Sequence, residues 1–215
     1  MAEKDTRELS VQGVKRLPYY LKYLKELEAS NTPYVPAAAI ADSLGIYEVQ
    51  VRKDLAAVSS SGGRPKIGYV LDTLILDVEK YLGYARTHQA VLVGVGHLGG
   101  ALLAYPGFAA YGVEILAAFD HSRTLIGSRI AGKPILDVAN ISQWCRNHRI
   151  EIGVLTVPAS AAQSACDALI AGGVRGIWNF APTHLRVPRG ILVQSEDMAI
   201  PLAMLSKHLE QPEYE

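Results

Sequence analysis

Residues 90–99 read Ala-Val-Leu-Val-Gly-Val-Gly-His-Leu-Gly. The continuous apolar run at the start is typical of a strand buried on both faces of a parallel sheet. Gly94, Gly96 and Gly99 follow it in the order Gly-x-Gly-x-x-Gly, and a helical pattern begins at Leu98. In such a strand–turn–helix unit the first glycine makes the tight turn, the second lets the backbone approach a pyrophosphate, and the third allows close helix–strand packing. The segment therefore predicts a phosphate-binding loop at a helix N-terminus.

An acidic residue, Asp120, ends the next apolar run about 20 residues after the last of these glycines. A carboxylate in that position binds the ribose hydroxyls of a dinucleotide and repels a 2′-phosphate. We therefore expect NAD(H) rather than NADP(H), although Arg123 is near enough to accept a phosphate. The alternative is an aspartate that only caps a strand-to-helix turn.

Apolar runs alternate with helical segments beyond the loop. Further strands are predicted at 113–119, 150–157, 174–178 and 191–193, with helices at 98–105, 138–148 and 159–171. This alternation predicts an α/β fold with a doubly wound parallel sheet, a Rossmann domain that we assign to residues 86–195. The segment 196–215 contains a largely apolar helix from Asp197 to Glu210 with no strand after it. Such a helix needs a surface to cover, and a dimer partner is a candidate.

The N-terminal part has a different pattern. Apolar and aromatic residues at three- and four-residue spacing predict a helix over 17–27, with Pro18 in its first turn. A short helix over 37–44 stops at Gly45, and a third helix follows over 47–59. Two helices joined by a tight turn that contains glycine are typical of a helix-turn-helix.

The segment after the third helix completes a winged helix. Residues 59–71 combine turn residues with short β-prone pieces, as the hairpin of a wing does. Asp72 is expected to cap a linker helix that runs to about Leu82. Residues 1–85 are therefore predicted to form a winged-helix DNA-binding domain with a linker helix.

Composition excludes several classes of protein. With 49% hydrophobic and 20% charged residues, the chain is globular rather than disordered. It has no apolar run long enough to span a membrane and no signal-peptide pattern, so we expect a cytoplasmic protein with no membrane partner. Cys145 and Cys166 lack any metal-ligand spacing and are interpreted as reduced packing residues. Because the net charge is zero, DNA binding must depend on local groups.

No catalytic or metal-binding group is recognisable. No tyrosine is followed four residues later by lysine, and the six histidines are scattered. A cofactor site without visible acid–base machinery, joined to a helix-turn-helix, favours a sensor rather than an enzyme. Two alternatives stay open: an NAD-dependent oxidoreductase with an unrecognised catalytic site, and an interaction module that binds nucleotide constitutively.

The sequence resembles the Rex family of NADH-sensing bacterial repressors. The matching segments, in order, are 15–24, 44–46, 50–55, 68–69, 94–99, 105–108, 118–120, 156–159, 179–182 and 205–209. The resemblance implies a winged-helix domain, a Rossmann domain and a C-terminal helix swapped between the subunits of a homodimer. It also implies that operator DNA is bound in the NAD⁺ or cofactor-free form and released when NADH accumulates. The wing sequence from Ala57 to Lys66 and His97 in the loop depart from the usual family pattern.

The resemblance and the motifs together give a set of expected site residues. Cofactor binding is assigned to Gly94, Val95, Gly96, His97, Leu98, Gly99, Tyr105, Asp120, Thr156, Val157, Pro158, Asn179 and Phe180. DNA binding is assigned to Gln50, Arg52 and Lys53 on the recognition helix and to Arg64 and Lys66 on the wing. The alternative for the helix is a solvated face paired with Glu48 and Asp54. By the resemblance, Tyr105 lies near the nicotinamide and Asp197 starts the swapped helix, with Arg16 as an alternative partner of that aspartate in a redox switch.

Overall fold

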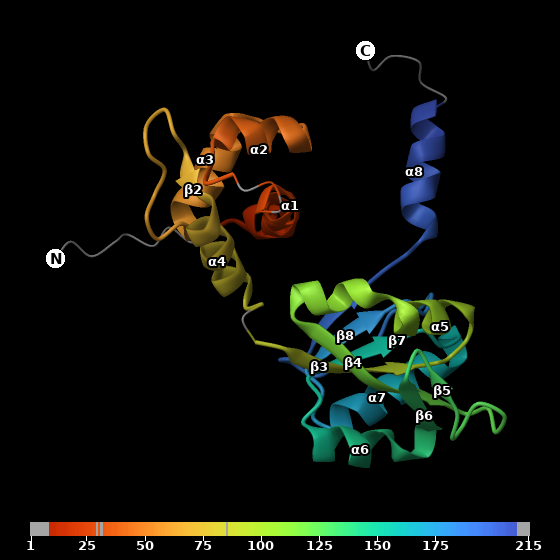
Figure 1. Cartoon of the computed structure of the whole chain (residues 1–215). Helices are drawn as coiled ribbons and strands as arrows, with labels where there is room; N and C mark the ends of the chain where they lie inside the picture. The colour runs from red at the N-terminus through yellow and green to blue at the C-terminus, as the bar shows by residue number, and fades with distance from the viewer. Residues whose placement is uncertain (1–8, 29, 31, 85, 210–215) are drawn as a thin grey trace. The chain divides into compact units, whose positions relative to one another are not determined.

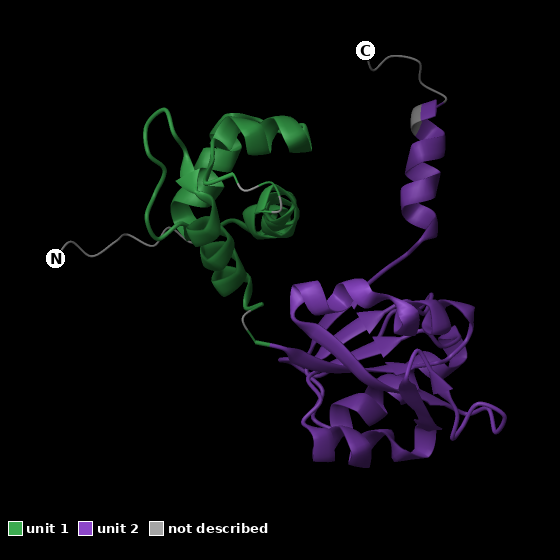
Figure 2. Ribbon diagram, viewed as in Figure 1, with its two compact units in different colours: residues 1–86 green, residues 87–215 purple. Residues whose placement is uncertain are grey.

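The computed structural model describes residues 9–28, 30, 32–84 and 86–209. The chain divides into two compact units, which we call the N-terminal unit (1–86) and the C-terminal unit (87–215) (Figure 2). Each unit has its own hydrophobic core, so each is described by itself. The further division predicted at residue 196 stays a prediction.

Four helices and a small sheet form the N-terminal unit (Figure 1). They are α1 (Val11–Glu28), α2 (Ala37–Leu44), α3 (Glu48–Val58) and α4 (Leu71–Leu82), with β1 (Tyr34–Val35) antiparallel to β2 (Tyr69–Val70). Leu17 and Leu24 from α1 meet Ile40, Leu55 and Leu74 from the other three helices in one fully buried core. The helical spacing of these apolar residues is what closes the unit around a single core.

Two details of this unit differ from the prediction. Helix α1 begins at Val11, so Pro18 lies inside the helix rather than in its first turn, and its missing N–H leaves the carbonyl of Val14 without a helical donor. Helix α4 begins at Leu71 with Val70 at the cap position, and no side chain caps it, so Asp72 is a first-turn residue and not the cap. Helix α2 was correctly predicted, and it ends at Gly45, whose φ is +62°.

The wing is a turn and not an extended hairpin. Arg64 and Gly68 form an isolated antiparallel bridge, while β2 pairs with β1 from before the helix-turn-helix. Gly68 has a φ of +98°, and a Cβ there would lie 2.3 Å from the carbonyl oxygen of Val35. Only glycine therefore lets the wing return to the sheet at this point.

A seven-stranded sheet forms the centre of the C-terminal unit, in the order β5-β6-β4-β3-β7-β8-β9. The strands are β3 (His88–Val93), β4 (Val113–Asp120), β5 (Arg129–Ile130), β6 (Lys133–Asp137), β7 (Ile152–Leu155), β8 (Gly176–Asn179) and β9 (Leu192–Ser195). All neighbouring pairs are parallel except β5 and β6. The chain starts at β3, adds β4 and β6 on one side, and then crosses to β7, β8 and β9 on the other, so β3 and β7 flank a topological switch point.

Helices cover both faces of this sheet. Helices α6 (Ile141–His148) and α7 (Ala159–Ala171) share one core with the sheet, and α5 (His97–Ala104) and η1 (Pro106–Tyr111) pack on the other face (Figure 1). A further 3-10 turn, η2 (Val138–Asn140), precedes α6. Strands β5 and β6 were not predicted from the sequence.

The last helix, α8 (Ala199–Leu209), is exposed along its described length. Its large apolar side chains are 57 to 82% exposed: Ile200, Leu202, Met204, Leu205 and Leu209. Glu210, the predicted end of this helix, lies outside the described residues. An apolar helix this exposed is typical of an element that packs against another chain.

Among the described residues, no helix is long and apolar enough to cross a membrane. Groups of three or more metal-ligating side chains are likewise absent from that part of the chain. Cys145 and Cys166 are both buried and not joined in a disulfide, and burial raises the pKa of Cys145 to about 11. Both are packing residues, because a thiol with a raised pKa is unreactive at neutral pH.

Candidate nucleotide site and nucleic-acid interface

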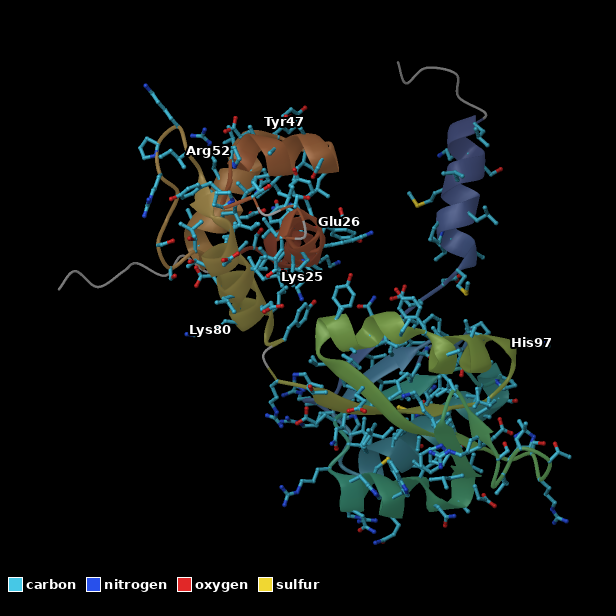
Figure 3. All side chains as sticks on the ribbon, in the orientation of Figure 1. Lys25, Glu26, Tyr47, Arg52, Lys80 and His97 are labelled. Carbon is cyan, nitrogen blue, oxygen red and sulfur yellow. The ribbon has the colours of Figure 1, made fainter. Side chains whose placement is uncertain are left out.

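The glycine loop joins β3 to α5 at the switch point of the sheet. Gly94 has a φ of +97°, and a Cβ at Gly99 would lie 2.0 Å from the carbonyl oxygen of Gly94. Gly96, the N-cap of α5, is exposed, and a Cβ there would meet nothing within 4 Å. The first and third glycines therefore serve the fold, while the second leaves open space in front of the backbone, as an approaching pyrophosphate requires. His97, the first residue of α5, is exposed beside it (Figure 3).

Asp120 supports this loop directly. Its Oδ2 accepts the N–H of Val95 at 2.7 Å, and its Oδ1 accepts the N–H of Ser122 at 2.8 Å. Burial alone would raise the pKa of Asp120, but these two backbone donors outweigh it, and the pKa lies below its ordinary value. The carboxylate is thus a fixed anion that shapes the loop, and each oxygen keeps a lone pair for a ribose hydroxyl. The turn-capping alternative describes a real contact, to Ser122, but it does not describe the whole role of the side chain.

The segment after β7 lies against the same loop. Thr156 Oγ1 donates to the carbonyl oxygen of Gly94 at 2.6 Å, and Val157 fills the space that a side chain at Gly94 would need. Pro158 is the N-cap of α7. The structure thus brings the three predicted residues 156–158 beside the glycine loop, at the carboxyl ends of β3 and β7, where open α/β sheets bind ligands.

Asn179 and Phe180 end β8 at the same edge of the sheet. The fully buried Asn179 donates through Nδ2 to the carbonyls of Ala181 and Thr183 and accepts the N–H of Ala181. Its side chain therefore holds the loop after β8 rather than reaching outward. Phe180 packs on Trp178 with ring centroids 4.5 Å apart.

Tyr105 lies where α5 ends and η1 begins. Its ring is edge-on to Phe108 at 5.0 Å, and Phe108 is in turn edge-on to Trp178 at 5.9 Å. Tyr105 is 55% exposed. The predicted residues Tyr105 and Phe180 are thus the two ends of one aromatic cluster. Tyr105 also lines a pocket with residues at the amino ends of β3 and β4, so its position near the nicotinamide stays a prediction.

Two of the three residues predicted to reach DNA from α3 are bonded to neighbours on the same helix. Gln50 Nε2 donates to Asp54 Oδ1 at 2.9 Å, and Arg52 bonds Glu48 Oε1 at 2.5 and 2.8 Å. Within the described residues, Lys53 has no acid at ion-pair distance. Helical spacing places an acid four residues from Gln50 and Arg52, so the alternative of a face paired with Glu48 and Asp54 describes real contacts. Contact of the three residues with DNA stays a prediction.

Arg16 is also bonded within the N-terminal unit. Its Nε and Nη2 bond the two oxygens of Asp54 at 2.8 and 3.0 Å, and the hydroxyl of Tyr20 donates to the same carboxylate at 2.8 Å. Asp54 is 2% exposed. Four hydrogen bonds from α1 and α3 compensate the negative charge of its buried carboxylate. Burial tends to raise the pKa of Asp54, but these donors hold it below its usual value. Arg16 is thus held by Asp54 within the N-terminal unit, and its pairing with Asp197 in a redox switch stays a prediction.

Two family models match the chain: a putative DNA-binding protein N-terminus over residues 8–56 and a CoA binding domain over residues 85–183. The redox-sensing transcriptional repressor Rex of Bacteroides fragilis is 39% identical over 212 residues, covering 99% of this chain and 96% of that protein. This chain belongs to the Rex family. Rex of Streptomyces coelicolor is 37% identical, covering 91% of this chain and 75% of that one.

Solved structures of a Rex-family repressor, RSP, have the same fold. RSP in complex with beta-NAD⁺ and operator DNA has a TM-score of 0.87 at 29% identity, covering 96% of this chain and 95% of RSP. RSP in complex with beta-NADH has a TM-score of 0.84 at 28% identity, covering 96% of this chain and 97% of RSP. The predicted Rex resemblance and the predicted pairing of a winged-helix and a Rossmann domain are confirmed.

The Rex wing of this chain borders an open groove of about 500 Å³ in the N-terminal unit. Arg52, Arg64 and Lys66 line it together with Glu48 and the start of α2. The guanidinium of Arg64 lies 5.9 Å from the ring centre of Tyr34, and Lys66 has a φ of +65°. The structure thus gathers three of the five predicted DNA-binding residues around one groove, with one acid among them.

Asp197 lies just before α8 in this Rex chain. Its Oδ1 accepts the N–H of Ala199, the first residue of α8, at 2.9 Å. This bond to the first turn is of the kind a capping aspartate makes, and the switch role stays a prediction.

Sequence reasoning missed two exposed residues at the start of the Rex recognition helix. Tyr47 is 87% exposed and Val49 is 78% exposed, the two highest values among the described large apolar residues of the N-terminal unit (Tyr47 is labelled in Figure 3). The exposure of Val49 could have been predicted from the helical period, because Val49 lies on the face of α3 opposite the buried Val51 and Leu55.

Proposed function

We propose that this chain is a homodimeric redox-sensing repressor that holds operator DNA through its N-terminal unit and NAD(H) in its C-terminal unit. When NADH accumulates, the protein leaves the operator. A repressor works where the genome lies, so we place it in the cytoplasm. Regulation, and not turnover of a substrate, is its role.

The observation that carries this proposal is the match to Rex proteins along nearly the whole chain, together with the RSP complexes that hold a nicotinamide dinucleotide and operator DNA. The open space at Gly96 and the fixed Asp120 carboxylate support a dinucleotide at the sheet edge. Lys53, Arg64 and Lys66 support contact with phosphates by the N-terminal unit.

Redox sensing requires different affinities for the two cofactor forms, because a ligand that binds two conformations equally shifts neither. The nicotinamide ring of NAD⁺ is positively charged and that of NADH is neutral. A closed, largely apolar pocket therefore disfavours NAD⁺, since burying its ring charge costs desolvation. NADH then selects the closed dimer, in which the two recognition helices no longer match the roughly 34 to 36 Å spacing of successive major grooves.

The exposed apolar side chains of α8 support a homodimer, and we propose that this helix is exchanged between subunits. Ile200, Leu202 and Leu205 are each more than half exposed. A two-fold dimer places the same surface of each subunit against its partner and matches a palindromic operator.

The deciding experiment is a DNA-binding titration at fixed salt. A labelled duplex, enriched by the protein itself from a random-sequence library, is followed by fluorescence anisotropy while NAD⁺ and NADH are varied. We expect retention with NAD⁺ and release with NADH. Equal binding at every ratio of the two would reject the redox mechanism.

The same protein preparation and library also test the two alternative functions, an oxidoreductase and a constitutive interaction module. An NAD-dependent oxidoreductase would consume NADH in the presence of a panel of aldehydes and ketones, and we expect no turnover. A constitutive interaction module would bind NADH but enrich no duplex from the library. Either result would replace the repressor assignment.

Lys53→Ala should reduce the slope of log affinity against log salt by about one unit for each bound subunit, since each lost phosphate contact releases fewer counterions. Lys80→Ala on α4 is the matched control, because it removes the same charge from an exposed lysine of the same unit. The slope for Lys80→Ala should stay unchanged. An unchanged slope for Lys53→Ala would remove this lysine from the interface.

We propose Arg16, Tyr105 and Asp197 as the switch residues, and Asp197→Asn separates the charge of Asp197 from its capping role. Asparagine caps a helix as well as aspartate does, so α8 should form normally. If the carboxylate charge is needed for the switch, more NADH is required to release the duplex. Asp197→Ala, which loses both features, should show the same shift. Release by Asp197→Asn at the wild-type NADH concentration would leave Asp197 as a cap alone.

A further inference from the structure

Helix α3 presents outward a row of residues in which only Lys53 has an assigned contact. Val49, Lys53 and Ala56 are exposed at positions i, i+4 and i+7, which lie on one face of a helix. Val51 and Leu55, on the opposite face, are fully buried in the core. The outward row therefore holds an apolar side chain, a cation and a small side chain in succession.

Polar residues on the flanks of this row are bonded to acids of the same helix. Gln50 on one flank donates to Asp54, and Arg52 on the other bonds Glu48. Val49, the first residue of the row, is 78% exposed, whereas most valines of a folded protein are buried. The outward face of the helix is thus apolar at Val49 and positively charged one turn later at Lys53.

We propose that Val49 reads the C5-methyl group of a thymine in the major groove, with Lys53 on a neighbouring phosphate. The inference rests on the proposed operator binding and adds a base preference to it. A base pair presents only one methyl group to the major groove, that of thymine, and apolar side chains contact it. The major groove is lined by anionic phosphates and carries isolated thymine methyl groups. A row of valine and lysine complements it in both charge and polarity. Ala56, one turn further on, is small enough to let the helix lie close to the bases.

The test replaces single thymines by deoxyuridine, which removes only the methyl group. A duplex enriched by the wild-type protein from a random-sequence library is substituted at each thymine in turn, and affinity is measured by fluorescence anisotropy. At one thymine of each half-site the wild type should lose about fourfold in affinity, the effect of one buried methyl group. For Val49→Ala the same substitution should cost less than about twofold, because the valine methyls that meet it are gone.

Val11→Ala is the matched control. Val11 is 73% exposed on α1 of the same unit, so the substitution removes the same atoms from an equally exposed valine. It should show the wild-type response to deoxyuridine. The inference is overturned if no thymine matters to the wild type, or if Val49→Ala and the wild type lose equally at every thymine. If the library yields no enriched duplex, the proposed repressor function fails and this inference fails with it.

Discussion

Asp54→Ala is expected to destabilise the N-terminal unit by about 3 kcal/mol, since breaking a buried ion pair leaves its partners uncompensated. The Asp54 carboxylate accepts from Arg16, Tyr20 and Gln50 and is almost fully buried. Without it, the buried hydroxyl of Tyr20 loses its acceptor, and the guanidinium of Arg16 keeps only its partial contact with water. Burial, followed by the bond to Asp54, raises the pKa of Tyr20 to about 12, so the hydroxyl stays a neutral donor that needs this acceptor.

The two tryptophans make the measurement specific. Both of them, Trp144 and Trp178, lie in the C-terminal unit, so their fluorescence reports on that unit alone. In urea, the far-ultraviolet circular dichroism of Asp54→Ala should show an early transition that tryptophan fluorescence does not. Asp42→Ala removes an exposed aspartate of α2 and should leave both transitions unchanged. A loss below about 1 kcal/mol in Asp54→Ala would mean that the network adds no more than a surface ion pair.

The same carboxylate gives a pH dependence with a defined sign. The folded pKa of Asp54 lies below its ordinary value, so its stabilisation is complete above the unfolded pKa of about 4. It is lost as the pH falls through the lowered folded pKa. The stability difference between wild type and Asp54→Ala should therefore be constant from pH 5 to 7 and shrink in more acidic solution. If the stability difference between wild type and Asp54→Ala stayed constant in acid, Asp54 would not stabilise the fold as a charged carboxylate.

Local signals predicted most of the fold. The apolar run before Gly94 and the glycine spacing are contiguous in sequence. They predicted a strand, a loop and a helix where the structure has β3, the glycine loop and α5. Strand β6 was missed because it is five residues long, contains Pro134 and has charged residues at both ends. The start of α1 was misplaced because the pattern was read only from Leu17 and Pro18 was assigned to a first turn. Val11 and Val14 continue the three-residue spacing in front of it, although both are exposed.

The candidate site also has parts that the sequence predicted and parts that it did not. The partners of the glycine loop follow from strand order, because residues at the carboxyl ends of β3 and β7 must meet. The bond between Arg16 and Asp54 joins residues 38 positions apart, and nothing in either local pattern indicates it. The bond from Gln50 to Asp54, by contrast, spans four residues of one helix, and the helical spacing indicated it. Only the burial of Asp54 by Arg16 and Tyr20 could not be predicted from sequence alone.

Gly96→Ala is expected to weaken binding of both NAD⁺ and NADH by about tenfold or more, while the fold survives. Gly96 has a φ of −76° and a ψ of −164°, which alanine also adopts, and a Cβ there meets nothing within 4 Å. The added methyl group would instead occupy the space in front of the α5 N-terminus, where a pyrophosphate accepts hydrogen bonds from backbone N–H groups. The cost to the helix cap itself should stay below about 1 kcal/mol.

Gly100→Ala is the matched control for this variant. A Cβ at Gly100 also meets nothing within 4 Å, but the residue lies inside α5, beyond the loop. Alanine there should stabilise the helix by up to about 1 kcal/mol and leave cofactor affinity unchanged. Isothermal titration with NADH measures both variants, and the operator titration adds a second readout: Gly96→Ala should stay on DNA at NADH concentrations that release wild type and Gly100→Ala. Wild-type NADH affinity in Gly96→Ala would mean that the cofactor does not approach the backbone at this glycine, and the assignment of the loop would fail while the fold assignment stood.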